Sequence, residues 1–278
     1  MNCKLLPAAV LLLLVACTGG GQQADFPAVD QDGRTAVVAH RGFWNCEEGG
    51  FSQNSIASLA AAQQAGFWGS EFDVHLTADD IVVVHHDPEH DGIQIQKNPY
   101  SALSECRLPN GETIPTLDEY LTQGEQCPVT MLVLELKKQQ NAEREDRLLA
   151  CCVDLLKGHG LFYPDRVVFI SFSRHICERI AELYPAFTNQ FLSGNLSPEA
   201  LARKGINGFD YERRILRLHS GWIRRAHALG QSTNAWTVNK AEDMQFLIDC
   251  GIDAITTNDP LLARELLGER EFRPEPAQ

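Results

Sequence analysis

The chain has 278 residues, of which 44% are hydrophobic, and a formal net charge of −13. This length is enough for one large hydrophobic core. The acidic surplus, without any long basic run, argues against nucleic-acid binding through an electrostatic footprint. An anionic ligand would therefore have to be attracted by a local group of charges.

The first sixteen residues are expected to be a bacterial lipoprotein signal peptide. Lys4 supplies a positive charge, residues 8–15 form a short apolar run, and residues 14–17 (LVAC) resemble a lipobox. In a lipobox the cysteine, here Cys17, is lipidated and becomes the mature N-terminus. The apolar run is too short for an ordinary membrane-spanning helix, which needs about 20 residues. A conventional cleaved signal, with Cys17 incidental, is the alternative.

The chain is expected to divide into four parts. These are the signal peptide at 1–16, a lipidated tether at 17–34, one folded domain at 35–270 and a C-terminal tail at 271–278. Removal of the first 16 of 278 residues leaves 262, within the size range of a single α/β barrel. The lipid would anchor the protein in the bacterial cell envelope. Thr18, rather than Asp, after the cysteine favours the outer membrane, facing the periplasm.

Strand-like apolar runs alternate with amphipathic helical stretches in the predicted domain. Strands are expected at residues 36–40, 69–76, 131–136, 167–171, 188–192, 206–211, 232–237 and 253–257. Helices are expected at residues 54–65, 141–157, 174–183, 198–204, 220–229, 241–250 and 260–267. This alternation predicts an α/β fold of the TIM type, a (β/α)8 barrel, in which a β-hairpin and the loop of residues 87–115 replace an early helix.

Residues 69–76 and 81–86 are expected to form that hairpin. The four residues between them are too few for a parallel crossover, so the two strands should be antiparallel. A turn centred on residues 78–79 sets the register and places Glu71 opposite His86.

The register of the hairpin determines which histidine lies on the same face as the carboxylates of Glu71 and Asp73. Side chains alternate between the two faces of a strand, so Glu71, Asp73 and His86 should share one face while His85 points to the other. A slip of one residue would exchange the two histidines, and a bulge is the other open possibility.

Seven cysteines remain if the signal peptide is removed and Cys17 is lipidated. Their spacings match no zinc motif, which favours structural thiols over metal ligands or nucleophiles. Cys106 and Cys127 flank a loop and could form a disulfide bond in an oxidising compartment.

Short motifs throughout the predicted domain resemble those of the glycerophosphodiester phosphodiesterase family. In the family's order they are His40-Arg41-Gly42, Asn54-Ser55, Glu71-Phe72-Asp73-Val74, His86-Asp87, Pro115-Thr116-Leu117, Leu134-Glu135-Leu136-Lys137, Ser171-Phe172, Trp236-Thr237-Val238-Asn239 and Thr257-Asn258-Asp259-Pro260. The resemblance implies that residues 35–270 form a TIM-type phosphodiesterase barrel. Such an enzyme hydrolyses glycerophosphodiesters to glycerol 3-phosphate and an alcohol, using a divalent cation, often Ca²⁺ or Mg²⁺.

The resemblance also implies roles for individual residues. These are metal binding by Glu71, Asp73 and Glu135, acid–base catalysis by His40 and His86, and phosphate binding by Arg41 and Lys137. A phosphodiester gains charge density in its transition state, so a hard cation on carboxylate oxygens and a guanidinium both stabilise it. Histidines titrate near neutrality, which suits proton transfer. The family pattern allows attack by the substrate's own glycerol hydroxyl through a cyclic phosphate, and which histidine acts as base is left open.

Trp236 is expected either to form an apolar wall of the substrate pocket or to pack inside the barrel. Gln53 and Asn54 are expected to support the metal ligands and Arg41 from behind. Gln53 stands where the family usually has glutamate, so an amide would accept a hydrogen bond from Arg41 without contributing a full charge. We therefore expect reduced or altered activity rather than none.

Two other functions are compatible with these residues. One alternative is a noncatalytic lipoprotein that binds a phosphorylated ligand or a cell-surface polymer, although all expected ligands and both histidines are retained. The other is a related phosphodiesterase that acts on intact lipids, although no exposed apolar hairpin for lipid insertion is evident.

Overall fold

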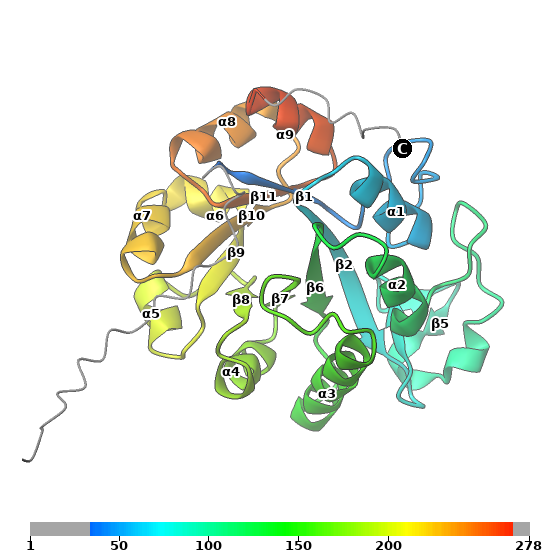
Figure 1. The fold of residues 1–278 in the computed structure, drawn as a ribbon. Helices are drawn as coiled ribbons and strands as arrows, with labels where there is room; N and C mark the ends of the chain where they lie inside the picture. The colour runs from blue at the N-terminus through cyan, green and yellow to red at the C-terminus, as the bar shows by residue number, and fades with distance from the viewer. Residues whose placement is uncertain (1–33, 269–278) are drawn as a thin grey trace, which may run out of the picture.

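The computed structural model describes residues 34–268, which form a closed barrel of eight parallel strands surrounded by helices (Figure 1). The strand order is β1-β11-β10-β9-β8-β7-β6-β2, and pairing of β1 with β2 closes the barrel. The predicted TIM-type fold is confirmed. The signal peptide, Cys17 and the tail at 271–278 lie outside the described residues, as does the tether except for Arg34.

The barrel strands lie where the sequence predicted them, with ends that differ by at most two residues. They are β1 (Ala36–Ala39), β2 (Gly69–Leu76), β6 (Met131–Leu136), β7 (Val167–Ser171), β8 (Thr188–Phe191), β9 (Gly208–Glu212), β10 (Ser232–Trp236) and β11 (Ala254–Thr257). The seven expected helices are α1 (Ile56–Gln64), α3 (Ala142–Gly158), α4 (Arg174–Leu183), α5 (Pro198–Ala202), α7 (Gly221–Ala228), α8 (Ala241–Asp249) and α9 (Pro260–Leu266).

Two short helices were absent from the sequence prediction. α2 (Leu117–Gly124) follows the insertion, and its first turn carries a capping box between Thr116 and Glu119 that could have revealed it. α6 (Arg213–Leu218) begins directly after β9, and Glu212 is both the last strand residue and the helix N-cap. No turn separates the two elements, so no sequence boundary marked this helix.

The hydrophobic core has an outer and an inner part. The outer part lies between the strands and the surrounding helices. The inner part fills the barrel, and its buried members are Ala36, Val38, Met131, Val133, Val168, Ile170, Leu192 and Ala254. Side chains point alternately into and out of the barrel along each strand. The inward-pointing positions at the carboxyl ends of the strands lie above this apolar layer, where polar side chains can occupy them.

The insertion between β2 and α2 contains the predicted hairpin and a small core of its own. β3 (Val82–Val84) pairs antiparallel with the second half of β2, and two short strands, β4 (Glu89–His90) and β5 (Ile93–Gln94), follow it. Two 3₁₀ turns, η1 (Ile95–Lys97) and η2 (Tyr100–Ala102), complete the insertion. Its buried apolar residues are Val83, Ile95, Leu103, Cys106, Leu108 and Ile114.

The predicted hairpin register is wrong by one residue. Val74 pairs with Val84, because the turn contains three residues, 78–80, rather than two. Asp80 closes the turn at φ +63°, a conformation that Asp tolerates better than most residues with a side chain. Its carboxylate accepts hydrogen bonds from Arg144 and Arg147 of α3, which holds the turn against the barrel.

The seven cysteines in the described part of the chain are free thiols, so Cys106 and Cys127 form no disulfide bond there. No helix within residues 34–268 has both the length and the apolar character needed to cross a bilayer.

Candidate active site at the carboxyl ends of the barrel strands

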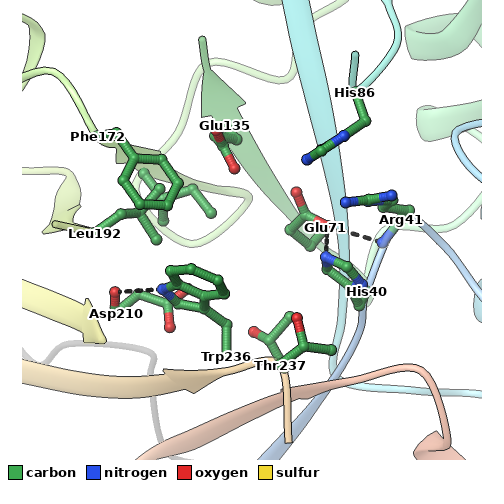
Figure 2. Close-up of a pocket in the computed structure, with 12 residues that line it drawn as sticks. His40, Arg41, Glu71, His86, Glu135, Phe172, Leu192, Asp210, Trp236 and Thr237 are labelled. Carbon is green, nitrogen blue, oxygen red and sulfur yellow. Dashed lines mark hydrogen bonds and ion pairs between the residues drawn. The ribbon is translucent and has the colours of Figure 1, made fainter. Parts of the chain in front are cut away.

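A cavity of about 170 Å³ opens at the carboxyl ends of the strands. Its lining residues are His40, Arg41, Glu71, His86, Glu135, Ile170, Phe172, Leu192, Asp210, Trp236, Thr237 and Thr256. Figure 2 shows His40, Arg41, Glu71 and His86 on one side, Phe172, Leu192, Asp210 and Trp236 on the other, and Glu135 between the two groups. Asp73 and Lys137 lie behind the charged side, and Asp210 is a lining residue that the sequence analysis missed.

Strand register brings the three predicted metal ligands together. Asp73 of β2 is directly opposite Glu135 of β6, and Glu71 lies two residues before Asp73 on the same face. One carboxylate oxygen from each residue lies within 4.8 Å of the other two, and all three side chains are buried. Three convergent carboxylates are an oxygen-rich donor set of the kind that hard divalent cations take. The residues therefore fit a bound divalent cation.

Burial and mutual repulsion perturb this cluster strongly. Burial raises the pKa of Glu71 well above its ordinary value, with Asp73 and Glu135 adding to the effect. Burial and Asp73 also raise the pKa of Glu135, to about 7. For Asp73, burial acts in the same direction, but nearby positive charge, led by Lys137, outweighs it and lowers the pKa. The cluster is an electrostatically strained group that a cation would stabilise.

Lys137 contacts the cluster rather than the cavity. Its Nζ lies 2.7 Å from an oxygen of Asp73 and 2.7 Å from an oxygen of Glu135. Burial opposes its charge, but these two carboxylates outweigh burial and raise its pKa. The structure thus places this ammonium group between two predicted metal ligands, where it holds them together.

The segment after β1 places His40 and Arg41 against Glu71. Ala39 pairs with Ser70, so His40 and Glu71 follow at the same level of the barrel. The backbone N–H of Arg41 donates to Glu71 Oε2 at 2.8 Å. Arg41 has φ +58°, a strained conformation of the kind found at functional sites.

Gly42 makes this turn possible. It has φ +80°, and a Cβ at this position would lie 2.3 Å from the side-chain oxygen and 2.7 Å from the backbone carbonyl carbon of Ser58. Gly111 offers a matched comparison, because it has φ +86° but open space around its Cβ position.

We expect Gly42→Ala to destabilise the protein by about 3 kcal/mol or more, since a steric clash adds to the unfavourable backbone conformation. Gly111→Ala should cost only about 1–2 kcal/mol, from the backbone alone. Chemical denaturation of the two variants measures the difference. Equal losses would show that the contact with Ser58 relaxes without cost.

Gln53 and Asn54 lie directly behind the charged side of the cavity. Gln53 Oε1 accepts a hydrogen bond from Arg41 Nη1 at 2.5 Å. The side chain of Asn54 donates to Asp73 Oδ2 at 2.8 Å and accepts from the Asp73 backbone N–H at 3.1 Å. The amide of Gln53 therefore orients the guanidinium, which also lies 3.6 Å from Asp73.

His40 and His86 are each held through Nδ1. His40 Nδ1 lies 2.7 Å from Asn258 Oδ1, and His86 Nδ1 lies 2.7 Å from Asp87 Oδ1. Burial lowers the pKa of His40 to about 4 and also lowers that of His86. In both rings Nε2 is the nitrogen available to a substrate. A further residue, His75, positions His86 by hydrogen bonding to its backbone oxygen at 3.1 Å.

His86 reaches the cavity although the hairpin register differs from the prediction. In a regular ladder with the observed register, His85 would lie opposite Asp73 and share its face. β3 ends at Val84, however. The backbone N–H of His85 still donates to the backbone oxygen of Asp73, but beyond this hydrogen bond the chain no longer pairs with β2. The ring of His85 then packs edge to face against His90, while His86 lines the cavity.

Two aromatic rings form the opposite wall. Phe172 and Trp236 pack edge to face with centroids 5.3 Å apart. The indole N–H of Trp236 donates to the backbone oxygen of Asp210 at 3.0 Å, which fixes the ring in the wall. Trp236 lines the cavity and also packs against the hydrophobic core inside the barrel, so it occupies both of the positions considered from the sequence.

The fold is a TIM barrel, and one cavity at the carboxyl ends of its strands contains carboxylates, two histidines and an arginine. This combination indicates a barrel enzyme that acts on phosphoesters. The comparisons with known proteins are more specific. The model of the glycerophosphoryl diester phosphodiesterase family matches residues 40–262. The chain belongs to this family and is a glycerophosphodiester phosphodiesterase.

Individual relatives agree. A crystal structure of a glycerophosphodiester phosphodiesterase from Parabacteroides distasonis is 39% identical, with a TM-score of 0.82, and the match covers 84% of this chain and 97% of that one. An Oleispira antarctica phosphodiesterase in complex with the product sn-glycerol-3-phosphate is 25% identical, with a TM-score of 0.70, over 85% and 98% of the two chains. The glycerophosphodiester phosphodiesterase of Caldanaerobacter subterraneus subsp. tengcongensis is 25% identical over 82% of this chain and 95% of its own length.

Proposed function

We propose that the protein hydrolyses glycerophosphodiesters to glycerol 3-phosphate and an alcohol, with a divalent cation held by Glu71, Asp73 and Glu135. The observation that carries this proposal is the buried group of three carboxylates beside two histidines at a single cavity, with His40 Nε2 3.9 Å from Glu71 Oε2. The cation, Ca²⁺ or Mg²⁺ by the chemistry of the oxygen ligands, would neutralise charge on the phosphate. The Oleispira antarctica relative supports glycerol 3-phosphate as the product.

The two histidines carry the proton transfers in this proposal. One imidazole accepts the proton of the attacking glycerol hydroxyl through Nε2, and the other, in its protonated form, donates a proton to the departing alkoxide. Asn258 and Asp87 hold the two rings in position through Nδ1. Water then opens the cyclic phosphate with the roles of the histidines reversed, so no protein nucleophile is needed.

Arg41 supplies positive charge on the cavity side of the cluster. Its guanidinium is oriented by Gln53 and lies at the cavity wall beside Glu71. A guanidinium so fixed stabilises the additional negative charge that develops on the phosphoryl oxygens. Lys137 assists from behind, by holding Asp73 and Glu135 in place.

The test is release of glycerol 3-phosphate by the purified protein from glycerophosphocholine, glycerophosphoethanolamine and glycerophosphoglycerol, with Ca²⁺, Mg²⁺ or a chelator. We expect release with a metal and none with the chelator. Vesicles of intact phospholipid form a separate arm. Turnover confined to the vesicles would support the lipid-acting alternative, and ligand binding without any turnover would support the noncatalytic one.

We also propose that Cys17 is lipidated and tethers the barrel to the outer membrane on its periplasmic side. The lipobox-like residues 14–17 support this proposal. When the full-length gene is expressed in a Gram-negative host, labelled fatty acid should be incorporated into the protein, and Cys17→Ala should prevent labelling. A labelled Cys17→Ala protein would contradict the assignment.

A further inference from the structure

Asp210 places in the cavity a buried carboxyl group that has no hydrogen-bond partner among residues 34–268. It lies on β9, is 1% exposed and lines the side of the cavity opposite His40 and Arg41 (Figure 2). Neither of its carboxyl oxygens accepts a hydrogen bond from any residue between 34 and 268. Its backbone oxygen, by contrast, is bound by Trp236.

The fold gives no reason for a carboxyl group at this position. A buried carboxylate without donors is costly, and such groups are normally paired. Asp210 lies outside the group formed by Glu71, Asp73 and Glu135, so the metal cluster does not account for it. The arginine of the cavity, Arg41, is already engaged with Asp73 and Gln53. The missing partner of Asp210 is therefore supplied by a ligand.

The surroundings indicate the chemistry of that ligand. Phe172, Trp236 and Leu192 line the same side of the cavity as Asp210 and present rings and aliphatic groups (Figure 2). Aromatic rings beside a carboxylate attract organic cations through both charge and ring quadrupole. An uncharged alcohol could hydrogen-bond to Asp210, Thr237 or Thr256, but it would gain no charge pairing with the carboxylate and no attraction to the ring faces.

The position of Asp210 relative to the reacting groups selects one end of the substrate. In the proposed reaction the glycerol hydroxyl attacks in line with the departing oxygen, so the departing alcohol points away from the attacking end. The phosphate and its glycerol occupy the side with the histidines and Arg41. The alcohol group then extends towards Trp236 and Asp210.

We infer, on the basis of the proposed function, that Asp210, Trp236 and Phe172 form a subsite for a positively charged alcohol group of the substrate, an ethanolammonium or a choline. Burial, with a smaller contribution from the charge of Glu135, raises the pKa of Asp210 well above its ordinary value, and an ammonium group beside it would favour the ionised form. Asp210 thus sets the preference among glycerophosphodiesters and takes no part in bond breaking.

The test compares Asp210→Asn with the wild-type protein on three substrates. The substitution keeps the shape of the side chain and removes its charge. We expect kcat/KM for glycerophosphoethanolamine and glycerophosphocholine to fall by about tenfold or more, through loss of a buried charged contact. The value for glycerophosphoglycerol, whose alcohol group is uncharged, should change by less than about threefold. Thr237→Val removes a polar group from the same cavity without changing its charge, and it should not alter the ratio between charged and neutral substrates.

The outcomes separate this inference from the proposed function. No hydrolysis of any substrate by the wild-type protein would refute the proposed function itself. Hydrolysis of all three by the wild type, with an equal loss on all three in Asp210→Asn, would refute only the subsite.

A second measurement needs no variant of Asp210, and so remains decisive if that variant does not fold. Ethanolammonium should inhibit hydrolysis of glycerophosphoglycerol by the wild-type protein at a concentration at least about tenfold lower than the uncharged ethylene glycol does. Equal inhibition by the two alcohols would overturn the assignment of a cation subsite.

Discussion

His86→Ala is expected to reduce kcat for glycerol 3-phosphate release by about 10²–10⁴-fold, the usual contribution of a positioned acid or base. His86 lines the cavity and is oriented by Asp87, so alanine removes the proposed proton-transfer group while the cluster of three carboxylates stays intact. The measurement is steady-state kinetics at saturating metal, with circular dichroism to confirm folding.

The adjacent histidine is the matched control. His85 differs by one position in the chain but packs against His90, away from the cavity. His85→Ala should retain kcat within about threefold, because it loses only a ring contact of about 1 kcal/mol. Loss of activity in His85→Ala with retention in His86→Ala would show that the chain leaves the hairpin ladder at a different residue.

Removal of one carboxylate from the cluster is expected to abolish stabilisation by metal. A cation that binds only the folded state, present at 100 times its dissociation constant, adds about 2.7 kcal/mol to the free energy of unfolding. The wild-type protein should gain this amount from Ca²⁺ or Mg²⁺. Glu71→Gln and Glu135→Gln should gain almost nothing, because each leaves two of the three acidic ligands. Thermal denaturation with metal or chelator measures the gain without relying on activity.

One control variant and the choice of cation make this experiment specific. Glu145 is buried on α3, where it accepts a hydrogen bond from Ser173 at 2.7 Å, so Glu145→Gln should lower stability but keep the full response to metal. A second group of potential ligands, His90, Asp91 and Cys106, lies in the insertion. Imidazole and thiolate ligands suit transition metals rather than Ca²⁺ or Mg²⁺.

If both Glu71→Gln and Glu135→Gln gained the same stability from metal as the wild-type protein, the cation would have to bind elsewhere.

The barrel could be predicted because its signals are local. Each buried parallel strand is a short apolar run, and each long helix has its own amphipathic pattern, so the eight strands and seven helices were found with nearly correct ends. The two missed helices have different explanations. α2 carries a local signal, the capping box of Thr116 and Glu119, which the sequence analysis did not use. α6 begins at the last residue of β9, so no turn in the sequence marks its start.

The site could be predicted only as a set of residue types. The motifs around His40, Glu71, His86 and Glu135 indicated metal and phosphate chemistry, and the hairpin was correctly expected. Its register was not, because the choice between a two-residue and a three-residue turn depends on Asp80. That residue is held in its left-handed conformation by arginines of α3, more than sixty positions away in the chain.

By itself, the sequence determined the fold class, the succession of elements and the chemical types available at the strand ends, because these follow from patterns within a few residues. The tertiary structure alone decided that Lys137 joins Asp73 to Glu135 and that His86 rather than His85 faces the cavity. It also decided that the Asp210 carboxyl group lies there without a hydrogen bond from residues 34–268. Each of these features depends on strand register and on the residue at which strand pairing ends. Contacts between segments distant in the chain determine the register and the end of pairing, and such contacts cannot be read from a local sequence pattern.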